Sequence, residues 1–225
     1  MFGIFGRLID FMVEVILFLY GIVPSYGLAI ILFTIAIKML LLPLMIKQTK
    51  SMKAMQDLQP QMKEIKDKYD DDKEKQQEEM MKLYQENNVN PIAGCLPLVV
   101  QMAIIIPLFR AIHQLEEVAP GFEEASFLWI GRITDGSLAE RDIILIVLTG
   151  LVMLAQSKIT QSISGGGGGS SKIMYFMPLF IIFIGFQLPS AVMIYILVAS
   201  AFSVFQQYYV KREPNEPEQV AEEAQ

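Results

Sequence analysis

The sequence has little of the chemistry on which most catalytic and metal sites depend. Its 225 residues include one cysteine, one histidine and one tryptophan. A single cysteine excludes a disulfide framework within the chain and a cysteine-rich metal site, and a single histidine argues against a histidine-based metal or acid–base site. No P-loop spacing is present, so no nucleotide is implied. We therefore expect no metal and no other cofactor, and we do not expect an enzyme.

Positive charge is also in deficit, whereas apolar side chains are abundant. The net charge of −6 and the isoelectric point near 4.9 argue against nucleic-acid binding as the main activity. Hydrophobic residues make up 53% of the chain, and the mean hydropathy is +0.41. Soluble domains rarely reach such a value, so the composition indicates a membrane protein.

Apolar residues gather in stretches that predict membrane-spanning helices. The five stretches are residues 27–46, 91–112, 143–155, 173–186 and 191–209. The third and fourth reach only about 20 Å as helices, less than the roughly 30 Å of a hydrocarbon core. Short helices draw the bilayer thinner around them. The sequence thus predicts an all-α membrane protein with five transmembrane helices and a local thin spot in the bilayer.

A lysine lies well inside the first of these stretches. At Lys38 a charged side chain would cost roughly 2.5–3.5 kcal/mol on insertion scales. Its ammonium could snorkel to the interface, but the next lysine, Lys47, is about 13 Å further along a helix. Thr34 lies one turn earlier on the same face. We therefore favour the interpretation that this polar face points at a wet cavity inside the bundle.

The N-terminal segment, residues 1–23, is apolar apart from one charged stripe. Arg7, Asp10 and Glu14 recur at helical spacing and form that stripe. The large apolar side chains that lie away from it are Phe5, Leu8, Met12, Val15 and Leu19. This pattern predicts an amphipathic helix in the plane of the membrane interface, on the outer side. A full span or an uncleaved signal sequence is the alternative, although a signal needs a basic start and a small-residue cleavage site, and neither is evident.

Residues 47–90 are polar, and apolar side chains recur among them every three or four positions. This pattern predicts a helical hairpin, with Pro60 kinking or restarting its first helix and the acidic run 70–72 marking the turn. A methionine-rich stripe follows the two helices, and its members are Met52, Met55, Met62, Met80 and Met81. The stripe is either the seam between the helices or an adaptable contact surface for apolar partners, and the two interpretations are compatible.

The distribution of lysine and arginine indicates the topology. Residues 47–90 hold nine lysines, whereas the loop 115–142, which contains the tryptophan, holds two arginines. The positive-inside rule therefore places the hairpin, the glycine-rich loop 161–172 and the tail 211–225 in the cytoplasm, and the N-terminus outside. The five consecutive glycines are typical of a flexible linker, of natural or engineered origin, and the acidic tail is typical of disorder.

Several segments occur together in a characteristic order. They are LLPLMIKQTKSMKAMQDLQPQMKEIKDKY (41–69), VNPIAGCLPLVVQM (89–102), FLWI (127–130), MYFMPL (174–179) and LPSAVMIY (188–195). Taken together, they resemble the YidC/Oxa/Alb family of membrane protein insertases, and the likeness is nearest to the short bacterial form without a large extracytoplasmic domain. No segment is decisive alone, but five in order are strongly specific.

The resemblance implies five core helices around a hydrophilic groove that opens to the cytoplasm and to lipid. It also implies that a basic residue in the groove attracts the acidic tail of a client. Lys38 matches that position, where the family usually has arginine, and Ala103 stands where the family often has proline. The groove residues expected on this basis, together with polar residues on neighbouring spans, are Lys38, Thr34, Gln101, Tyr195, Gln156 and Ser200.

The function expected from the resemblance is insertion of nascent membrane proteins into the bacterial cytoplasmic membrane. The hairpin would capture the client, and the apolar segment of the client would slide out along Met102, Ile105, Phe176, Phe180 and Phe183. The expected partners are nascent membrane proteins, the ribosome and the lipid bilayer, with the Sec translocon as a further candidate and no nucleic acid beyond the ribosome. A small-solute transporter or channel and a non-inserting assembly scaffold are the alternatives, and no internal repeat of the kind common in transporters is found.

Overall fold

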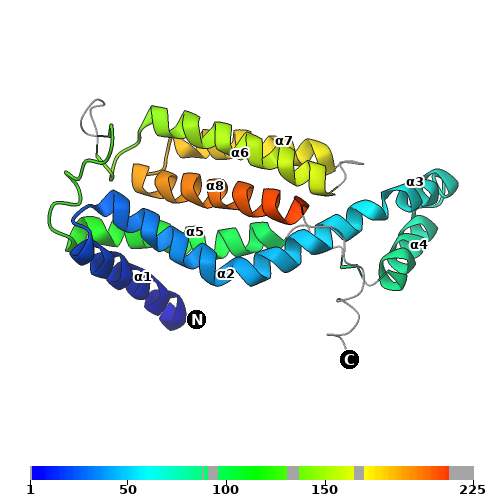
Figure 1. The fold of residues 1–225 in the computed structure, drawn as a ribbon, viewed down its shortest axis with the longest axis horizontal. Helices are drawn as coiled ribbons and strands as arrows, with labels where there is room; N and C mark the ends of the chain where they lie inside the picture. The colour runs from blue at the N-terminus through cyan, green and yellow to red at the C-terminus, as the bar shows by residue number, and fades with distance from the viewer. Residues whose placement is uncertain (1, 88, 91–95, 131–136, 165–169, 213–225) are drawn as a thin grey trace.

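The computed structural model describes residues 2–87, 89–90, 96–130, 137–164 and 170–212. Every regular element in these ranges is an α-helix (Figure 1). The eight helices of the described residues are α1 (Phe2–Ile22), α2 (Tyr26–Asp57), α3 (Gln59–Lys68), α4 (Lys73–Glu86), α5 (Leu96–Val118), α6 (Ile143–Ser164), α7 (Ser170–Gly185) and α8 (Ser190–Arg212). The all-α prediction is therefore confirmed for this part of the chain.

The long helices form a bundle, with α3 and α4 projecting as a hairpin from one end (Figure 1). The most buried of the membrane-length helices is α8, which packs against α6 and α2. Small side chains at Ala191, Ala199 and Ser203 are buried along it and allow the neighbouring backbones to approach closely. At the end far from the hairpin, apolar side chains of α2, α5, α6 and α8 fill the bundle, among them Ile30, Leu108, Ile146 and Val192.

The helix α2 is bent by 60° between its halves Tyr26–Leu40 and Leu42–Asp57. Pro43 accounts for the position of the bend, because its ring clashes with the carbonyl four residues earlier, that of Met39. The second half continues without a break into the polar stretch, so the first predicted span and the start of the predicted hairpin are one helix. Pro60 then lies in the first turn of α3, where its missing N–H costs little.

Three helices of the described chain, α5, α6 and α8, are long and apolar enough to cross a membrane, and the bent α2 makes a fourth candidate. The prediction of a short third span is wrong, because α6 has 22 residues and extends about 33 Å. Its second half carries Gln156, which was expected in the groove and lines the cavity described below, and Thr160, which bonds to Gln207 of α8. With 16 residues, α7 remains short.

One face of α1 is buried against α2 and α5 through Met12, Val13 and Ile16. The predicted charged stripe lies on its exposed side, where Asp10 accepts a hydrogen bond from Gln114 of α5 at 3.2 Å. Other apolar side chains of α1 stay largely exposed, with Phe11 at 60% and Phe18 at 69%. The helix therefore offers one apolar face to the bundle and another to its surroundings.

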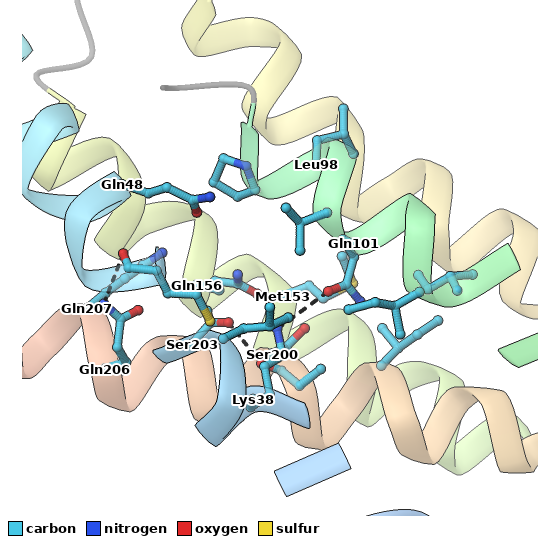
Figure 2. Close-up of a pocket in the computed structure, with 18 of the residues that line it drawn as sticks. Lys38, Gln48, Leu98, Gln101, Met153, Gln156, Ser200, Ser203, Gln206 and Gln207 are labelled. Carbon is cyan, nitrogen blue, oxygen red and sulfur yellow. Dashed lines mark hydrogen bonds between the residues drawn. The ribbon is translucent and has the colours of Figure 1, made fainter. Parts of the chain in front are cut away.

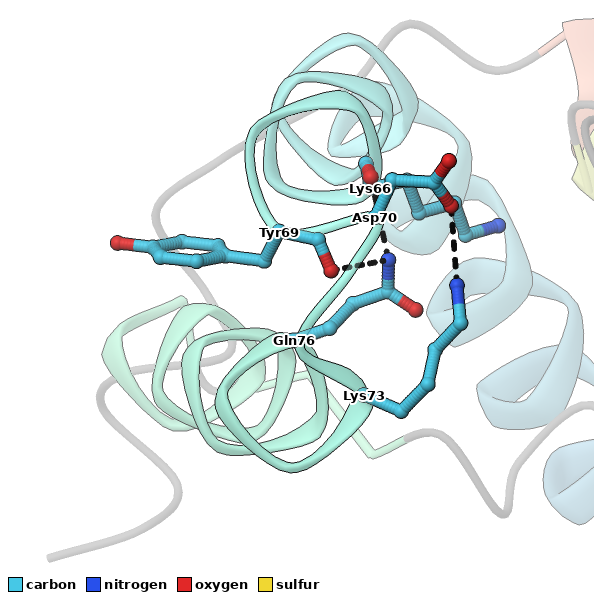
Figure 3. A network of polar contacts seen from close by, with 5 residues as sticks. All are labelled: Lys66, Tyr69, Asp70, Lys73 and Gln76. Carbon is cyan, nitrogen blue, oxygen red and sulfur yellow. Dashed lines mark hydrogen bonds and ion pairs between the residues drawn. The ribbon is translucent and has the colours of Figure 1, made fainter.

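A small separate core holds the hairpin together. Its buried residues are Leu58, Met62, Leu83, Tyr84 and Val89, and Met55 and Met80 pack against them. The turn between the helices is closed by Gln76 of α4, whose amide nitrogen donates to the carbonyl oxygens of Lys66 at 3.2 Å and Tyr69 at 3.5 Å (Figure 3). Three methionines of the predicted stripe thus lie in the seam, whereas Met81 is 51% exposed.

The loop between α5 and α6 is tied to the start of α6. The indole Nε1 of Trp129 donates to Asp142 at 3.1 Å, and the same carboxylate caps α6 by accepting from the backbone N–H of Leu145 at 2.7 Å. Most of the predicted linker 161–172 and of the predicted disordered tail 211–225 falls on residues outside those described, namely 165–169 and 213–225. The described ends of both segments are helical, because α6 extends to Ser164, α7 begins at Ser170 and α8 extends to Arg212.

Candidate functional site

A cavity of about 190 Å³ lies among the described parts of α2, α5, α6, α7 and α8 (Figure 2). It lies toward the hairpin end of the bundle, because its lining begins at Lys38 on α2, is confined to the first half of α5, and runs from Ile196 to Gln207 on α8. The opposite half is packed with buried apolar side chains. The polar side chains of the lining are Lys38, Gln48, Thr49, Gln101, Gln156, Ser200, Ser203, Gln206 and Gln207.

Lys38 is the one cation among the lining residues, and none of them is a carboxylate. Its side chain comes from α2 two residues before the bend, and the residue is only 6% exposed. The ammonium Nζ donates a hydrogen bond to the amide oxygen of Gln101 on α5 at 3.4 Å (Figure 2). Among the described residues no acidic group pairs with it. The cavity therefore holds a buried positive charge without a counter-charge, to which an anionic group can bind.

The predicted groove residues are only partly brought together. Lys38, Gln101, Gln156 and Ser200 all line the cavity. Thr34 is fully buried one turn earlier, outside the lining, and its hydroxyl donates to the carbonyl of Ile30 at 2.7 Å. Tyr195 is also fully buried outside the lining; its hydroxyl faces Gln101, without a hydrogen bond of standard geometry to any described residue.

The predicted sliding surface divides between the cavity and the outside of the bundle. Met102 and Ile105 of α5 line the cavity. Phe180 and Phe183 of α7 are 44% and 68% exposed. The side chain of Phe176 is outside the described part of the structure. Of the methionines assigned to the hairpin, Met52 lies in the cavity lining instead.

Sequence reasoning did not assign a second group of polar lining residues to the groove. Gln48 and Thr49 come from the part of α2 that we read as hairpin, and Ser203, Gln206 and Gln207 come from the end of α8. The available signal was spacing. On α2 the lining residues 38, 41, 45, 48 and 52 recur every three or four positions across the boundary that we drew at residue 47.

Most of this second group is already hydrogen-bonded. The Thr49 hydroxyl donates to the carbonyl of Met45 at 2.9 Å and accepts from the amide nitrogen of Gln206 at 3.1 Å. Gln207 accepts from the hydroxyl of Thr160 at 2.9 Å. Gln48 differs, because its amide nitrogen is buried and has no partner among the described residues. The cavity therefore offers one positive charge, neutral amides and hydroxyls, and, at Gln48, a buried amide donor without a described partner.

The fold and this cavity define a multi-pass helical membrane protein with a chamber of mixed polar and apolar lining toward one end of its bundle. The family model described as 60Kd inner membrane protein matches residues 18–217. The chain therefore belongs to the 60Kd inner membrane protein family, in agreement with the resemblance stated above.

Relatives with printed names extend this result. A protein of Listeria monocytogenes serotype 4b (strain F2365) named membrane protein insertase YidC 1 is 42% identical over 189 residues, which are 81% of this chain and 62% of the relative. Membrane protein insertase YidC 2 of Bacillus anthracis is 40% identical over 192 residues, 83% of this chain and 72% of that protein. An active YidC insertase crystal structure with the first transmembrane domain resolved matches with a TM-score of 0.70 and 30% identity, over 92% of this chain and 46% of the other. The chain thus spans less than two thirds of some proteins that it matches.

Proposed function

We propose that this chain inserts nascent membrane proteins into the bacterial cytoplasmic membrane and that the cavity receives the polar tail of the client. The observation that carries the proposal is Lys38, a lysine only 6% exposed in a cavity whose described lining contains no carboxylate. An acidic tail supplies the missing counter-charge, while the glutamine, serine and threonine side chains replace part of its hydration. The tail therefore loses less solvation on its way into the membrane.

The proposed topology places the hairpin and the cavity mouth at the cytoplasmic side, and α2, α5, α6, α7 and α8 as the five spans. Support comes from the nine lysines of residues 47–90 and from the apolar packing that closes the other half of the bundle. In this arrangement α1 lies at the outer interface and holds the bundle through its buried face. The short α7 extends about 24 Å and thins the bilayer beside the cavity.

In the proposed sequence of events, the hairpin first captures the client, with Met81 as its exposed methionine. The tail then enters the cavity, and the apolar segment moves past Met102 and Ile105 toward lipid, where Phe180 and Phe183 are exposed. Burial of the apolar segment in lipid drives the reaction, and the membrane potential adds about 2.3 kcal/mol per charge per 100 mV. The ribosome, and the Sec translocon where it takes part, are proposed to deliver the client on the hairpin side.

The test is insertion by the purified chain in liposomes, with single-span clients whose translocated tails are either acidic or uncharged. Protease protection of the tail measures the rate. Lys38→Ala should slow the acidic-tailed client about tenfold or more, the effect of losing a charge-assisted contact, and Lys38→Arg should retain activity. An assembly scaffold would be indifferent to both substitutions, and a channel would pass small solutes without protecting any tail. Wild-type protein that protects no tail would refute the proposed function itself.

A further inference from the structure

The orphaned amide of Gln48 points to a role of the cavity that is independent of charge. Gln48 is 5% exposed, lines the cavity, and keeps its amide nitrogen buried without a hydrogen-bond partner in the described chain. Figure 2 shows its amide directed from α2 into the space toward Leu98 and Gln101 of α5. A buried donor without an acceptor costs free energy, and a donor in the wall of a cavity regains that free energy when an acceptor enters the cavity.

The surroundings of Gln48 restrict what that occupant can be. Four further glutamines line the same cavity, and so do Thr49, Ser200 and Ser203. Neutral amides and hydroxyls both donate and accept hydrogen bonds, which is the pairing that a peptide group requires. Lys38 is the one charged side chain of the described lining, and it lies ten residues before Gln48 on α2.

Every client tail, whatever its sequence, carries backbone groups that need hydrogen-bond partners inside the membrane. Every peptide group that it carries into hydrocarbon has an N–H and a C=O to satisfy, and an unsatisfied group costs several kcal/mol. A side-chain charge addresses only acidic tails, whereas amide donors and acceptors serve any backbone. The cavity is roomy enough for several water molecules or for a short extended stretch of chain.

We propose that Gln48 and the neighbouring amides of the cavity form a subsite for the peptide backbone of the client, in which the Gln48 amide nitrogen donates to a backbone carbonyl. This subsite lies between Lys38 and the hairpin on α2. It rests on the proposed insertase function and adds to it a second, sequence-independent contact. Lys38 selects clients with acidic tails, and the glutamine subsite supports passage of every tail.

The experiment compares Gln48→Leu with Gln161→Leu in the full-length protein, reconstituted in liposomes with the acidic-tailed and uncharged-tailed clients. Gln161 is a matched control, because its amide nitrogen is also buried without a described partner but it does not line the cavity. Gln48→Leu should slow both clients by about five-fold, the effect of one hydrogen bond on a rate. Gln161→Leu should leave both rates unchanged.

Folding is checked separately by thermal unfolding in detergent, where both leucine variants should match or exceed the wild type because each removes an unpaired buried donor. Gln48→Asn, which keeps the amide but shortens its reach, should slow both clients less than Gln48→Leu. Unchanged rates for Gln48→Leu, or slowing of the acidic-tailed client alone, would overturn the subsite. If Lys38→Ala had no effect but Gln48→Leu slowed both clients, the charge mechanism would fail and the backbone subsite would stand.

Discussion

Lys38 on α2 and Gln101 on α5 meet across the cavity, with the ammonium donating to the amide oxygen at 3.4 Å. The two residues are 63 positions apart in the chain, and this contact is the one hydrogen bond that the structure gives Lys38 among the described residues. A buried ammonium with a single neutral partner is poorly compensated. The contact therefore holds Lys38 in place while leaving its charge available to a ligand.

The first prediction concerns the coupling of this pair. Gln101→Leu should destabilise the protein by about 1–3 kcal/mol, because it leaves the Lys38 ammonium buried without a hydrogen bond. Lys38→Ala together with Gln101→Leu should be less destabilising than the sum of the single changes, since the alanine removes the unpaired charge. Thermal unfolding in detergent measures the three variants as a double-mutant cycle.

Gln114→Leu is the control for this cycle, because Gln114 is also on α5 but bonds to Asp10 at the surface. Its effect should be about 0.5 kcal/mol or less and should add to that of Lys38→Ala. Strictly additive effects of Lys38→Ala and Gln101→Leu would show that the 3.4 Å contact has no energetic significance.

The second prediction concerns the close approach of Gly27 to the loop between α5 and α6. A Cβ at Gly27 would collide with the ring of Phe127. Gly27→Ala should therefore destabilise the protein by about 1–3 kcal/mol, as overpacking usually does. Phe127→Ala in the same chain should recover part of that loss, and Gly21→Ala should be neutral because open space surrounds its Cβ position. Equal melting temperatures for Gly27→Ala and Gly21→Ala would show that Phe127 and its loop move aside without a cost in stability.

The sequence revealed the site residue that is unusual for its surroundings, Lys38 in an apolar stretch, and missed the one that is ordinary for its surroundings, Gln48 in a polar stretch. Lys38 was found because a charge inside an apolar run has no ordinary explanation. Gln48 was missed because a glutamine beside Lys47 looks like the start of a solvated helix. It is buried because α2 bends near Pro43 and continues past the other helices, and the path of α2 after the bend cannot be predicted from the local sequence.

The end of α6 is a second place where the local sequence did not predict the burial of polar residues. The apolar run ends at Ala155, and so the sequence predicted a short span over residues 143–155, with Gln156 assigned to the groove just beyond it. The helix continues to Ser164 because Gln156 faces the cavity and Thr160 bonds to Gln207 of α8. Neutral polar side chains can be buried where another helix supplies their hydrogen-bond partners, and the local sequence does not predict which helix that is.

The third prediction concerns the 60° bend of α2. Pro43→Ala should restore the hydrogen bond to the Met39 carbonyl and straighten the helix. Spin labels at Leu28 and Asp57 should then move apart from about 38 Å toward about 43 Å, for a rise of 1.5 Å per residue. Electron–electron double resonance measures this distance. Pro107→Ala in α5 is the matched control and should leave it unchanged; an unchanged distance in Pro43→Ala would assign the bend to packing alone.

The fourth prediction separates the hairpin seam from its exposed surface. Leu83 is 7% exposed in the hairpin core, whereas Met81 on the same helix is 51% exposed. Leu83→Ala should cost about 2–4 kcal/mol, a large fraction of what a five-residue core can provide. The amides of α3 and α4 should then exchange with solvent much faster, while those of the buried α8 should keep their protection.

Met81→Ala should leave all of these exchange rates unchanged, because its side chain adds little to the seam. The same variant should nevertheless reduce crosslinking of a ribosome-bound nascent chain to the hairpin, since an exposed methionine adapts to apolar segments of many shapes. Faster exchange in Met81→Ala would place this residue in the seam after all. Full crosslinking in Met81→Ala, with the hairpin intact, would remove Met81 from client capture and leave the remaining hairpin surface to be tested.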